Sequence, residues 1–255
     1  MNDSAVLTEP REDVLVVTIN RPEQRNAVDA AVAQGIASSL DQLDADDALS
    51  IGVITGSGQG FCAGMDLKAF VAGERPYAGD RGFAGITRRG TVKPLIAAVE
   101  GFAVAGGLEV ALACDLIVAA RGAKLGIPEV KRSLVAAGGA LLRLPRVLPR
   151  NVAMELALTG ESILAERGFE LGLVNRLADP GETLDVALEL AAAVARNGPL
   201  ALAASKRILT ESADWPEAEF FERQDAIAQP VMRSQDAREG ATAFAEKRPP
   251  VWRGR

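Results

Sequence analysis

Short runs of aliphatic and β-branched residues, each closed by a turn, dominate the first half of the chain. The clearest are Val14–Ile19, which ends at an Asn-Arg-Pro turn, and Leu95–Val99, which leads into a glycine-rich segment. Residues 51–55 form a similar run, and residues 116–119 and 123–126 follow later. Runs of this length, bounded by Gly, Pro or Asn, are typical of buried strands.

A helical period follows the first of these strands. Apolar residues recur three or four positions apart at Val28, Val32, Ile36, Leu40 and Leu43. This spacing predicts an amphipathic helix, and Asn26 with Asp29 three residues later can serve as its N-terminal cap. A shorter helix is expected at about 108–114. The alternation of strand, turn and helix predicts an α/β core built mainly on parallel strands.

The second half of the chain is rich in Ala and Leu and is mainly helical in pattern. Helices are expected at 141–148, 151–158, 165–171, 184–196, 200–212, 216–228 and 234–246, and only 173–177 has the character of a strand. Asn197, Gly198 and Pro199 form a helix stop followed by a restart. We therefore place a boundary here, between a core of residues 1–197 and a helical region of residues 198–255.

Composition narrows the functions that this fold could have. The 255 residues are 48% hydrophobic and 24% charged, which is typical of a globular protein with one large domain or one domain and a modest addition. The formal net charge is −6 and no basic block occurs, so nucleic-acid binding is not expected. Because the sequence has no histidine, Ser-His-Asp and Cys-His catalysis and the usual zinc sites are excluded. Acid–base chemistry is left to carboxylates, Lys, Tyr or backbone groups.

The sequence also bears on the compartment. The N-terminus lacks a basic segment followed by an apolar one, and the apolar stretch at 108–120 is interrupted by Glu109 and Asp115. The two cysteines, Cys62 and Cys114, do not form a disulfide framework. We expect a cytoplasmic protein without membrane association.

The glycine-rich segment after residue 55 has two features with a possible chemical role. The GSGQG motif at 56–60 could cradle a phosphate, but it lacks the ending of a P-loop and places Phe61 where a dinucleotide fingerprint has its third glycine. We expect a tight turn with a positive φ instead. Cys62 could be a nucleophile, but without a histidine to deprotonate it we expect a small buried hydrophobic residue.

Glu109 is the first candidate for acid–base chemistry. It lies in the first turn of a helix opened by Gly106 and Gly107, where free amides and the helix dipole can stabilise negative charge. An exposed glutamate here would only compensate the dipole, which is the commoner situation. The apolar residues that follow it indicate instead that Glu109 is partly buried, where a carboxylate needs a partner or a function.

Glu129 is the second candidate and follows the strand expected at 123–126. On the residues alone, we favour a salt bridge to Lys131 or Arg132, and a catalytic role is the alternative. Glu109 and Glu129 are 20 residues apart, so they can share a site only if the intervening strands bring them together.

Several motifs occur in the order and at the spacing of a known family. They include FCAGMDLK at 61–68, KPLIAAV at 93–99, GGLEVALACD at 106–115 and GIPEVK at 126–131. Others are NRP at 20–22, Arg25-Asn26-Ala27, AMELALTG at 153–160, GLVN at 172–175 and EGATAFAEK at 239–247. Nearly the whole chain thus resembles the crotonase (enoyl-CoA hydratase/isomerase) superfamily. It is most similar to actinobacterial enoyl-CoA hydratases, and the ending FAEKRPPVWRG at 244–254 also resembles carnitinyl-CoA dehydratase.

The resemblance implies a spiral core of stacked ββα units with a C-terminal helical region, assembled as trimers and often as dimers of trimers. It implies that the backbone amides of Met65 and Gly106 form an oxyanion hole for the oxygen of an acyl-CoA thioester. Glu109 matches the family's first catalytic glutamate and Glu129 its second, which is the pattern of true hydratases.

Other positions are implied for the substrate and the water. Arg25 and the backbone around Ala63, Asp66 and Leu67 correspond to positions that flank the nucleotide and pantetheine of coenzyme A. Ala137 occupies the position whose amide helps to hold the water. The chain departs from the common family pattern at three alanines. Ala105 and Ala140 stand where glycine is frequent, and Ala136 stands where proline is frequent.

Residues 72–85 are the one long turn-rich segment of the core, and we expect them to be mobile. Tyr77 and Phe83 in this segment offer apolar contacts to an acyl chain. The segment is therefore the expected selector of the acyl group.

These features together favour an enoyl-CoA hydratase, which adds water reversibly and syn to a 2-enoyl-CoA to give a 3-hydroxyacyl-CoA. Glu109 is the expected base and Glu129 the expected acid, with no metal and no cofactor beyond the coenzyme A of the substrate. One alternative is carnitinyl-CoA dehydratase or another acyl-CoA hydratase. The other is a non-catalytic acyl-CoA-binding protein on the same scaffold.

Overall fold

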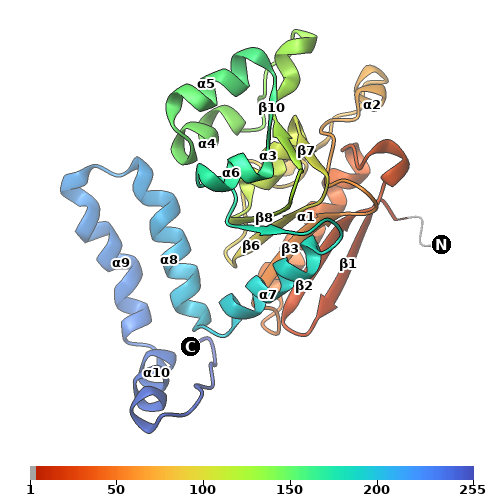
Figure 1. Ribbon diagram of the computed structural model, residues 1–255. Coiled ribbons are helices and arrows are strands. Elements are labelled where there is room, and N and C mark those ends of the chain that lie inside the picture. The colour runs from red at the N-terminus through yellow and green to blue at the C-terminus, as the bar shows by residue number, and fades with distance from the viewer. Residues whose placement is uncertain (1–3) are drawn as a thin grey trace.

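The computed structural model describes residues 4–255, and its core is a six-stranded sheet (Figure 1). In spatial order the strands are β1 (Val6–Arg11), β2 (Val14–Ile19), β3 (Ile51–Gly56), β6 (Leu95–Val99), β8 (Leu116–Ala120) and β11 (Arg176–Ala178). β1 pairs with β2 antiparallel, and all other pairs in this sheet are parallel. The predicted α/β core of mainly parallel strands is confirmed.

The central strands are buried on both faces because helices cover each face. α1 (Ala30–Ala45) packs on one side of the sheet and α7 (Thr183–Ala195) on the other. Neighbouring residues of β3 therefore enter different hydrophobic clusters, Ile54 the one that includes α1 and Val53 the one that includes α7. This two-sided burial explains why the strands are continuous apolar runs in the sequence.

The N-terminus of α1 differs from the prediction. Asp29 alone caps the helix, since its carboxylate accepts a hydrogen bond from the amide of Val32 at 2.9 Å. Asn26 is buried with φ 55°, and its Nδ2 donates to the carbonyl oxygens of Ser57 and Gly60 at 2.8 and 2.7 Å. Asn26 thus holds the glycine-rich turn after β3 and is not part of the cap.

A second sheet of three strands lies in the order β10, β9 and β7, which are Ser162–Leu164, Lys124–Gly126 and Phe102–Val104. The segment predicted to be a mobile loop contains a small hairpin with two residues in each strand, β4 (Tyr77–Ala78) and β5 (Gly82–Phe83). This hairpin packs against α1. The strands β1, β7 and β10 were not predicted. β7 and β10 are too short to show a period, and β1 is an edge strand that contains Pro10 and two charged residues, Glu9 and Arg11.

The strand predicted at 173–177 begins only at Arg176. Leu173 and Val174 are apolar because they pack into the core. Asn175 pairs with Ile117 instead, through its backbone amide and its side-chain oxygen, each at 2.8 Å.

Most of the helices predicted from the sequence are present in the structure. They are α2 (Leu67–Val71), α3 (Gly106–Ala113), α4 (Ala140–Val147), α5 (Arg150–Thr159), α6 (Ala165–Glu170), α8 (Pro199–Glu211), α9 (Phe220–Met232) and α10 (Gln235–Glu246). The helix expected from residue 216 starts at Phe220, because a short 3-10 turn follows Pro216.

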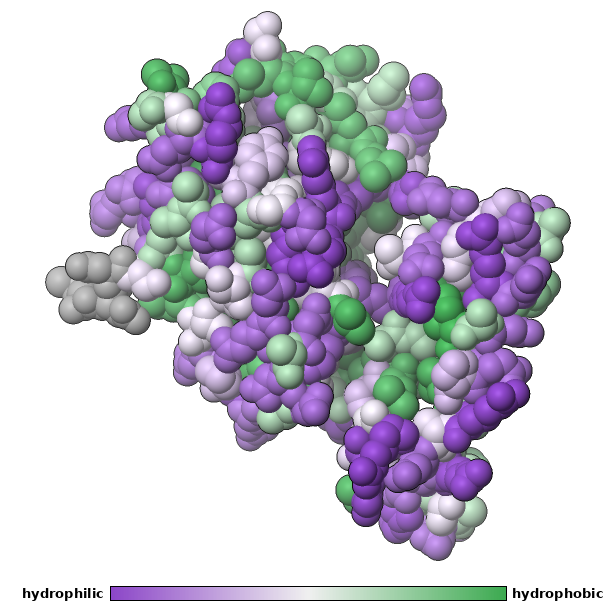
Figure 2. Space-filling model, turned by 180° about the vertical axis from the view of Figure 1, so that it is seen from behind, coloured by the Kyte–Doolittle hydropathy of each residue, from purple (hydrophilic) through white to green (hydrophobic). Residues whose placement is uncertain are grey.

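The last three helices, α8 to α10, form an arm that projects from the rest of the molecule (Figure 1). The axes of α7 and α8 differ by 106° across the break at residues 196–198, next to the predicted boundary, which stays a prediction. Figure 2 shows hydrophobic surface on this arm. Among the described residues no single helix is long and apolar enough to cross a membrane, and α7 with α8 passes by length and composition only as a bent pair.

Candidate active site

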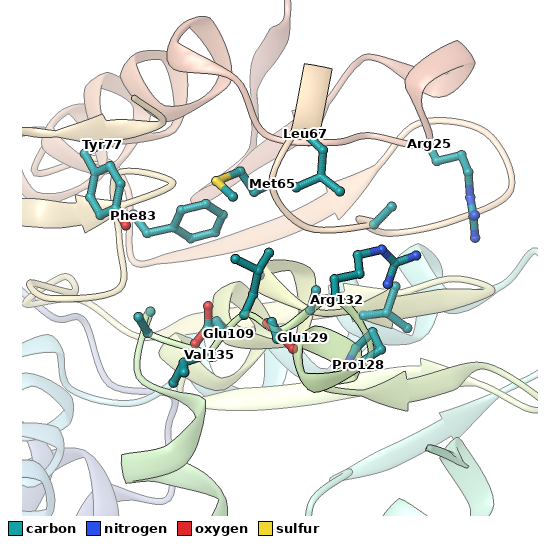
Figure 3. A pocket seen from close by; sticks show the side chains of 17 residues that line it. Arg25, Met65, Leu67, Tyr77, Phe83, Glu109, Pro128, Glu129, Arg132 and Val135 are labelled. Carbon is teal, nitrogen blue, oxygen red and sulfur yellow. The ribbon is translucent and has the colours of Figure 1, made fainter. Parts of the chain in front are cut away.

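A pocket of about 320 Å³ lies where the loop before α2, the β4–β5 hairpin, α3 and the 3-10 turn η3 (Pro128–Arg132) meet. Every residue predicted for the site lines this pocket except Asp66: Arg25, Ala63, Met65, Leu67, Tyr77, Phe83, Gly106, Glu109, Glu129 and Ala137. Segments far apart in the sequence thus meet in one place, as Figure 3 shows for the labelled side chains.

Asp66 has a different role. Its carboxylate caps α2 by accepting hydrogen bonds from the amides of Lys68 and Ala69, and it pairs with Arg21 at 3.1 Å. Burial alone would raise the pKa of Asp66, but the hydrogen bond from the Ala69 amide and the charge of Arg21 hold it below its ordinary value. Asp66 therefore shapes the loop that carries Met65 and does not face the pocket.

Two backbone amides line the pocket without a partner. Neither the amide of Met65 nor that of Gly106 donates a hydrogen bond to another group in residues 4–255. The two segments approach closely, since a Cβ on Gly64 would lie 2.9 Å from the amide nitrogen of Gly106. Two free donors that line the same pocket from closely packed segments are suited to hold an oxygen that acquires negative charge.

Helix α3 starts from a strained residue. Ala105, its N-cap, has φ 52° and ψ −131°, a conformation that favours glycine. Gly107 in the first turn is pressed against the carbonyl of Cys62, where no Cβ fits. The tight start directs Glu109, two residues later, into the pocket.

Glu109 is buried, with 4% of its surface exposed, so it does not merely compensate the helix dipole from the surface. Its Oε1 accepts a hydrogen bond from the amide of Ala140 at 3.2 Å, and its Oε2 lies where a Cβ on Gly138 would be. Burial raises the pKa of Glu109, an effect that the amides of Ala140 and Gly138 and the charge of Arg143 partly offset. The carboxylate is thus anchored at the N-terminus of α4.

Glu129 faces the same pocket, and its predicted salt bridge is wrong. Lys131 pairs instead with Glu161 at 2.5 Å, and no ion pair joins Glu129 to Arg132. Within residues 4–255, Oε2 of Glu129 is the only buried side-chain polar atom without a hydrogen-bond partner. The 3-10 turn explains the difference, because it directs Glu129 inward and leaves Lys131 exposed.

The two glutamates lie next to each other on the side of the pocket opposite Met65 and Leu67 (Figure 3). Burial raises the pKa of Glu129, and the negative charge of Glu109 raises it further. Two carboxylates in such a place resist simultaneous ionisation and titrate as a coupled pair. Such a pair can supply one base and one acid.

The ends of the pocket differ in chemistry. Tyr77 and Phe83 form one end, with their rings edge to face and their centroids 6.0 Å apart. Arg25 and Arg132 lie toward the other end, and the Arg25 guanidinium stacks over the Phe102 ring at 4.4 Å. An elongated ligand with an apolar and an anionic end would match this polarity.

Sequence reasoning missed several lining residues: Val104, Ala105, Pro128, Arg132, Leu134, Val135 and Gly138. The sequence predicts Arg132 only as a partner for Glu129. The structure adds that apolar side chains beside it, Leu134 and Val135, are exposed where they border the pocket.

Two other sequence expectations near the site are confirmed, the tight turn after β3 and the buried cysteine. Gly58 has φ 74° in the turn after β3. Cys62 is fully buried, and burial raises the pKa of its thiol to about 12, which is incompatible with a thiolate nucleophile. Within residues 4–255 no cluster of Cys, Asp and Glu side chains is arranged to hold a metal ion.

Comparisons of the chain with known proteins point to one family. A model of the enoyl-CoA hydratase/isomerase family matches residues 9–255. An enoyl-CoA hydratase of Mycobacterium tuberculosis is 42% identical, over 98% of this chain and 96% of its own. A carnitinyl-CoA dehydratase of Salmonella paratyphi A is 41% identical over the full length of both chains.

Solved structures of similar proteins also match over nearly the whole chain. An enoyl-CoA hydratase from Mycobacterium marinum is 57% identical, with a TM-score of 0.98 over 99% of this chain and 100% of its own. A carnitinyl-CoA hydratase from Mycobacterium avium is 43% identical, with a TM-score of 0.80 over both full chains. These matches confirm the crotonase-type fold with its C-terminal helices. The chain belongs to the enoyl-CoA hydratase/isomerase family.

Proposed function

We propose that the protein is an enoyl-CoA hydratase, which adds water reversibly to a 2-enoyl-CoA and gives a 3-hydroxyacyl-CoA. The observation that carries the proposal is the placing of two carboxylates, the buried Glu109 and the half-buried Glu129, with two free amides, those of Met65 and Gly106, around one pocket. Family membership supports an acyl-CoA thioester as the substrate.

The amides of Met65 and Gly106 would hold the thioester oxygen. Addition of water to the double bond moves electron density onto this oxygen, as in an enolate. Fixed N–H donors stabilise such an oxygen more than the neutral ground state, and loss of one donor typically costs about 3 kcal/mol in activation free energy. The amide pair thus lowers the barrier to the step that forms the C–O bond.

The glutamates would divide the proton transfers. The ionised carboxylate of Glu109 removes a proton from the water while the water oxygen bonds to the β carbon. Glu129, protonated, gives its proton to the α carbon as the double-bond electrons that had moved to the thioester return. Both groups act from the same side of the pocket, so the addition is syn, and dehydration reverses each step. Proton exchange with solvent then restores both carboxyl groups.

Other lining residues would bind the remaining parts of the substrate. Ala137 borders the pocket, and its amide donates to no other group in residues 4–255, so it can help to hold the water. Arg25 and the backbone at Ala63 and Leu67 would flank the coenzyme A moiety. The two glutamates supply both proton transfers and the two amides stabilise the oxyanion, so the proposed mechanism uses no cofactor beyond the coenzyme A of the substrate.

Carnitinyl-CoA is a second candidate substrate. The Salmonella relative carries the name carnitinyl-CoA dehydratase and matches the full length of this chain. Tyr77 and Phe83 at the acyl end of the pocket offer ring faces that could contact a quaternary ammonium group. The β4–β5 hairpin, which carries both rings, is accordingly the proposed selector of the acyl group.

The test is hydration of crotonyl-CoA, followed by the loss of enone absorbance, together with a panel of longer, branched and carnitine-derived enoyl-CoAs. We expect turnover of crotonyl-CoA, and the panel ranks the acyl groups. Turnover of crotonobetainyl-CoA alone would favour the second candidate. Thioester binding without turnover of any member of the panel would refute the hydratase proposal and favour a non-catalytic binding protein.

A further inference from the structure

Arg143 occupies an unusual position behind the candidate site. Its guanidinium donates to two backbone carbonyls, that of Thr87 at 2.7 Å and that of Gly138 at 3.4 Å. It forms no ion pair with any carboxylate in residues 4–255, although its side chain is partly buried. A partly buried cation without an ion pair is costly unless its position serves another purpose.

The two glycines of the turn before α4 separate Arg143 from Glu109. A Cβ on Gly138 would collide with the Glu109 carboxylate, and a Cβ on Gly139 would collide with Nη1 of Arg143. Gly139 has φ 110°, which only glycine adopts readily. Glu109 and Arg143 thus press on opposite sides of one turn, whose end supplies the Ala140 amide to Glu109.

The second carbonyl connects this turn to the acyl end of the pocket. Thr87 is buried and follows Phe83 by four residues, in the segment that leaves the β4–β5 hairpin. One side chain therefore joins the segment behind the hairpin to the turn that holds Glu109.

Resting on the function proposed above, we propose that Arg143 is a positioning residue for Glu109. It holds the Gly138–Gly139 turn in the conformation that presents the Ala140 amide to the carboxylate, and its positive charge favours the ionised state in which Glu109 acts as a base. Arg143 touches no reacting atom, because the turn lies between it and the pocket. The nearest charged and titratable groups are Glu109, Arg146 and the thiol of Cys114, and Glu109 also faces Glu129. On its other side Arg143 lines a cavity whose charged residues are Asp44, Arg88, Arg89, Asp115, Lys206, Arg207 and Glu211.

The geometry predicts separate effects of charge and of shape. Arg143→Met removes both the charge and the two hydrogen bonds, so the carboxylate loses its fixed place and kcat should fall by up to about 100-fold, as a displacement of about 1 Å can cause. The lost positive charge raises the pKa of Glu109, so the acid limb of the kcat/KM–pH profile should move to higher pH. Arg143→Lys keeps the charge without the planar fork, and should lower kcat while leaving the acid limb near its wild-type position.

The experiment measures kcat, KM and the pH profile of crotonyl-CoA hydration for both variants, with thermal unfolding of each. Arg146→Met is the matched control, because Arg146 lies on the same helix, is exposed and pairs with Asp214. We expect the control to keep wild-type kcat and acid limb. A folded Arg143→Met enzyme with unchanged kcat and acid limb would overturn the proposal, as would lower stability alone.

If Arg143→Met does not fold, Arg143→Lys decides, and wild-type kcat in that variant overturns the proposal. The two proposals fail differently. An inactive wild type would refute the hydratase function, whereas an active wild type with insensitive Arg143 variants would refute only the positioning role.

Discussion

Gly64 and Gly106 approach so closely that a Cβ on Gly64 would lie 2.9 Å from the Gly106 amide nitrogen and 2.8 Å from the Cβ of Ala105. Gly64 directly precedes Met65, so this contact sets the distance between the two amides that line the pocket. The spacing of the candidate oxyanion hole thus depends on the absence of a side chain at one position.

Gly64→Ala should separate these amides and lower kcat by about 100-fold or more, the usual effect of losing one oxyanion donor. Gly73→Ala is a matched control, because the backbone φ is 95° at Gly64 and 93° at Gly73, and nothing lies within 4 Å of a Cβ at Gly73. Both variants place a Cβ on a backbone with a similar positive φ, but only Gly64→Ala adds the clash with Ala105 and Gly106. Gly64→Ala should therefore lose more stability than Gly73→Ala, and it alone should lose turnover. Equal kcat values for Gly64→Ala and Gly73→Ala would show that Gly64 does not affect catalysis.

Glu109→Gln and Glu129→Gln should each reduce kcat by at least about 100-fold, because each removes one proton transfer and keeps the shape of the side chain. The double variant should fall well short of the product of the two losses, since the groups act as a unit. Binding of a CoA thioester, measured by calorimetry, should persist. Glu161→Gln, at the exposed partner of Lys131, serves as the control and should keep normal turnover. Normal turnover in either single variant of the pair would exclude that residue from the mechanism.

Stability should depend on pH in a defined direction at Glu129. Burial and the charge of Glu109 raise its pKa in the folded state, so the fold favours the protonated form. The corresponding contribution to stability is fully present below the ordinary pKa of Glu, and it is lost as the pH rises through the folded-state value. At pH values above the folded-state pKa, the wild type therefore contains an unfavourable, partly buried charge that Glu129→Gln lacks.

Differential scanning calorimetry should accordingly show a higher Tm for Glu129→Gln than for wild type at pH 8, and a shrinking difference toward pH 4. Glu166→Gln tests the opposite sign. The pKa of Glu166 is lowered, chiefly by hydrogen bonds from its own amide and from that of Gly122, so this substitution should give no gain at pH 8. A lower Tm for Glu129→Gln at pH 8 would contradict this prediction, because it would mean that the ionised carboxylate of Glu129 stabilises the folded protein.

Ala105→Gly should stabilise the protein. The φ of 52° and ψ of −131° at Ala105 cost of order 1–3 kcal/mol for a residue with a Cβ, and glycine relieves this strain at an entropic cost of about 0.4–1 kcal/mol. Tm should rise by a few degrees, at about 2–4 °C per kcal/mol for a chain of this size, with kcat unchanged. Ala113→Gly, at the other end of α3 with ordinary helical geometry, should lower Tm. A fall in Tm for Ala105→Gly would show that the residue is not strained.

The arm should bury its apolar face against another copy of the chain. Leu209, Phe221, Met232 and Phe244 are 77%, 72%, 69% and 87% exposed, more than a helical arm of this size usually leaves in water. Sedimentation at micromolar concentration should show a trimer or a dimer of trimers, and Phe244→Glu should shift it toward smaller species. A monomeric wild type would contradict this expectation.

The sequence by itself determined the secondary structure of the core and the identity of the family. Buried parallel strands and amphipathic helices have local periods, so β2, β3, β6 and α1 could be located within a residue or two. Motifs at family spacing and the turn-rich segment at 72–85 indicated part of the pocket lining, and every residue so indicated meets there except Asp66. Local periods and motif spacings depend only on the order of residues along the chain, so the sequence alone shows them.

Only the tertiary structure decided which group each polar side chain faces. Local spacing favoured a salt bridge for Glu129 and a cap role for Asn26, yet Glu129 turns into the pocket and Asn26 holds the turn at Gly60. The contact between Arg143 and the carbonyl of Thr87 joins residues 56 positions apart. Hydrogen bonds of this kind arise when packed strands and helices bring distant segments together, so no period or spacing in the sequence records them.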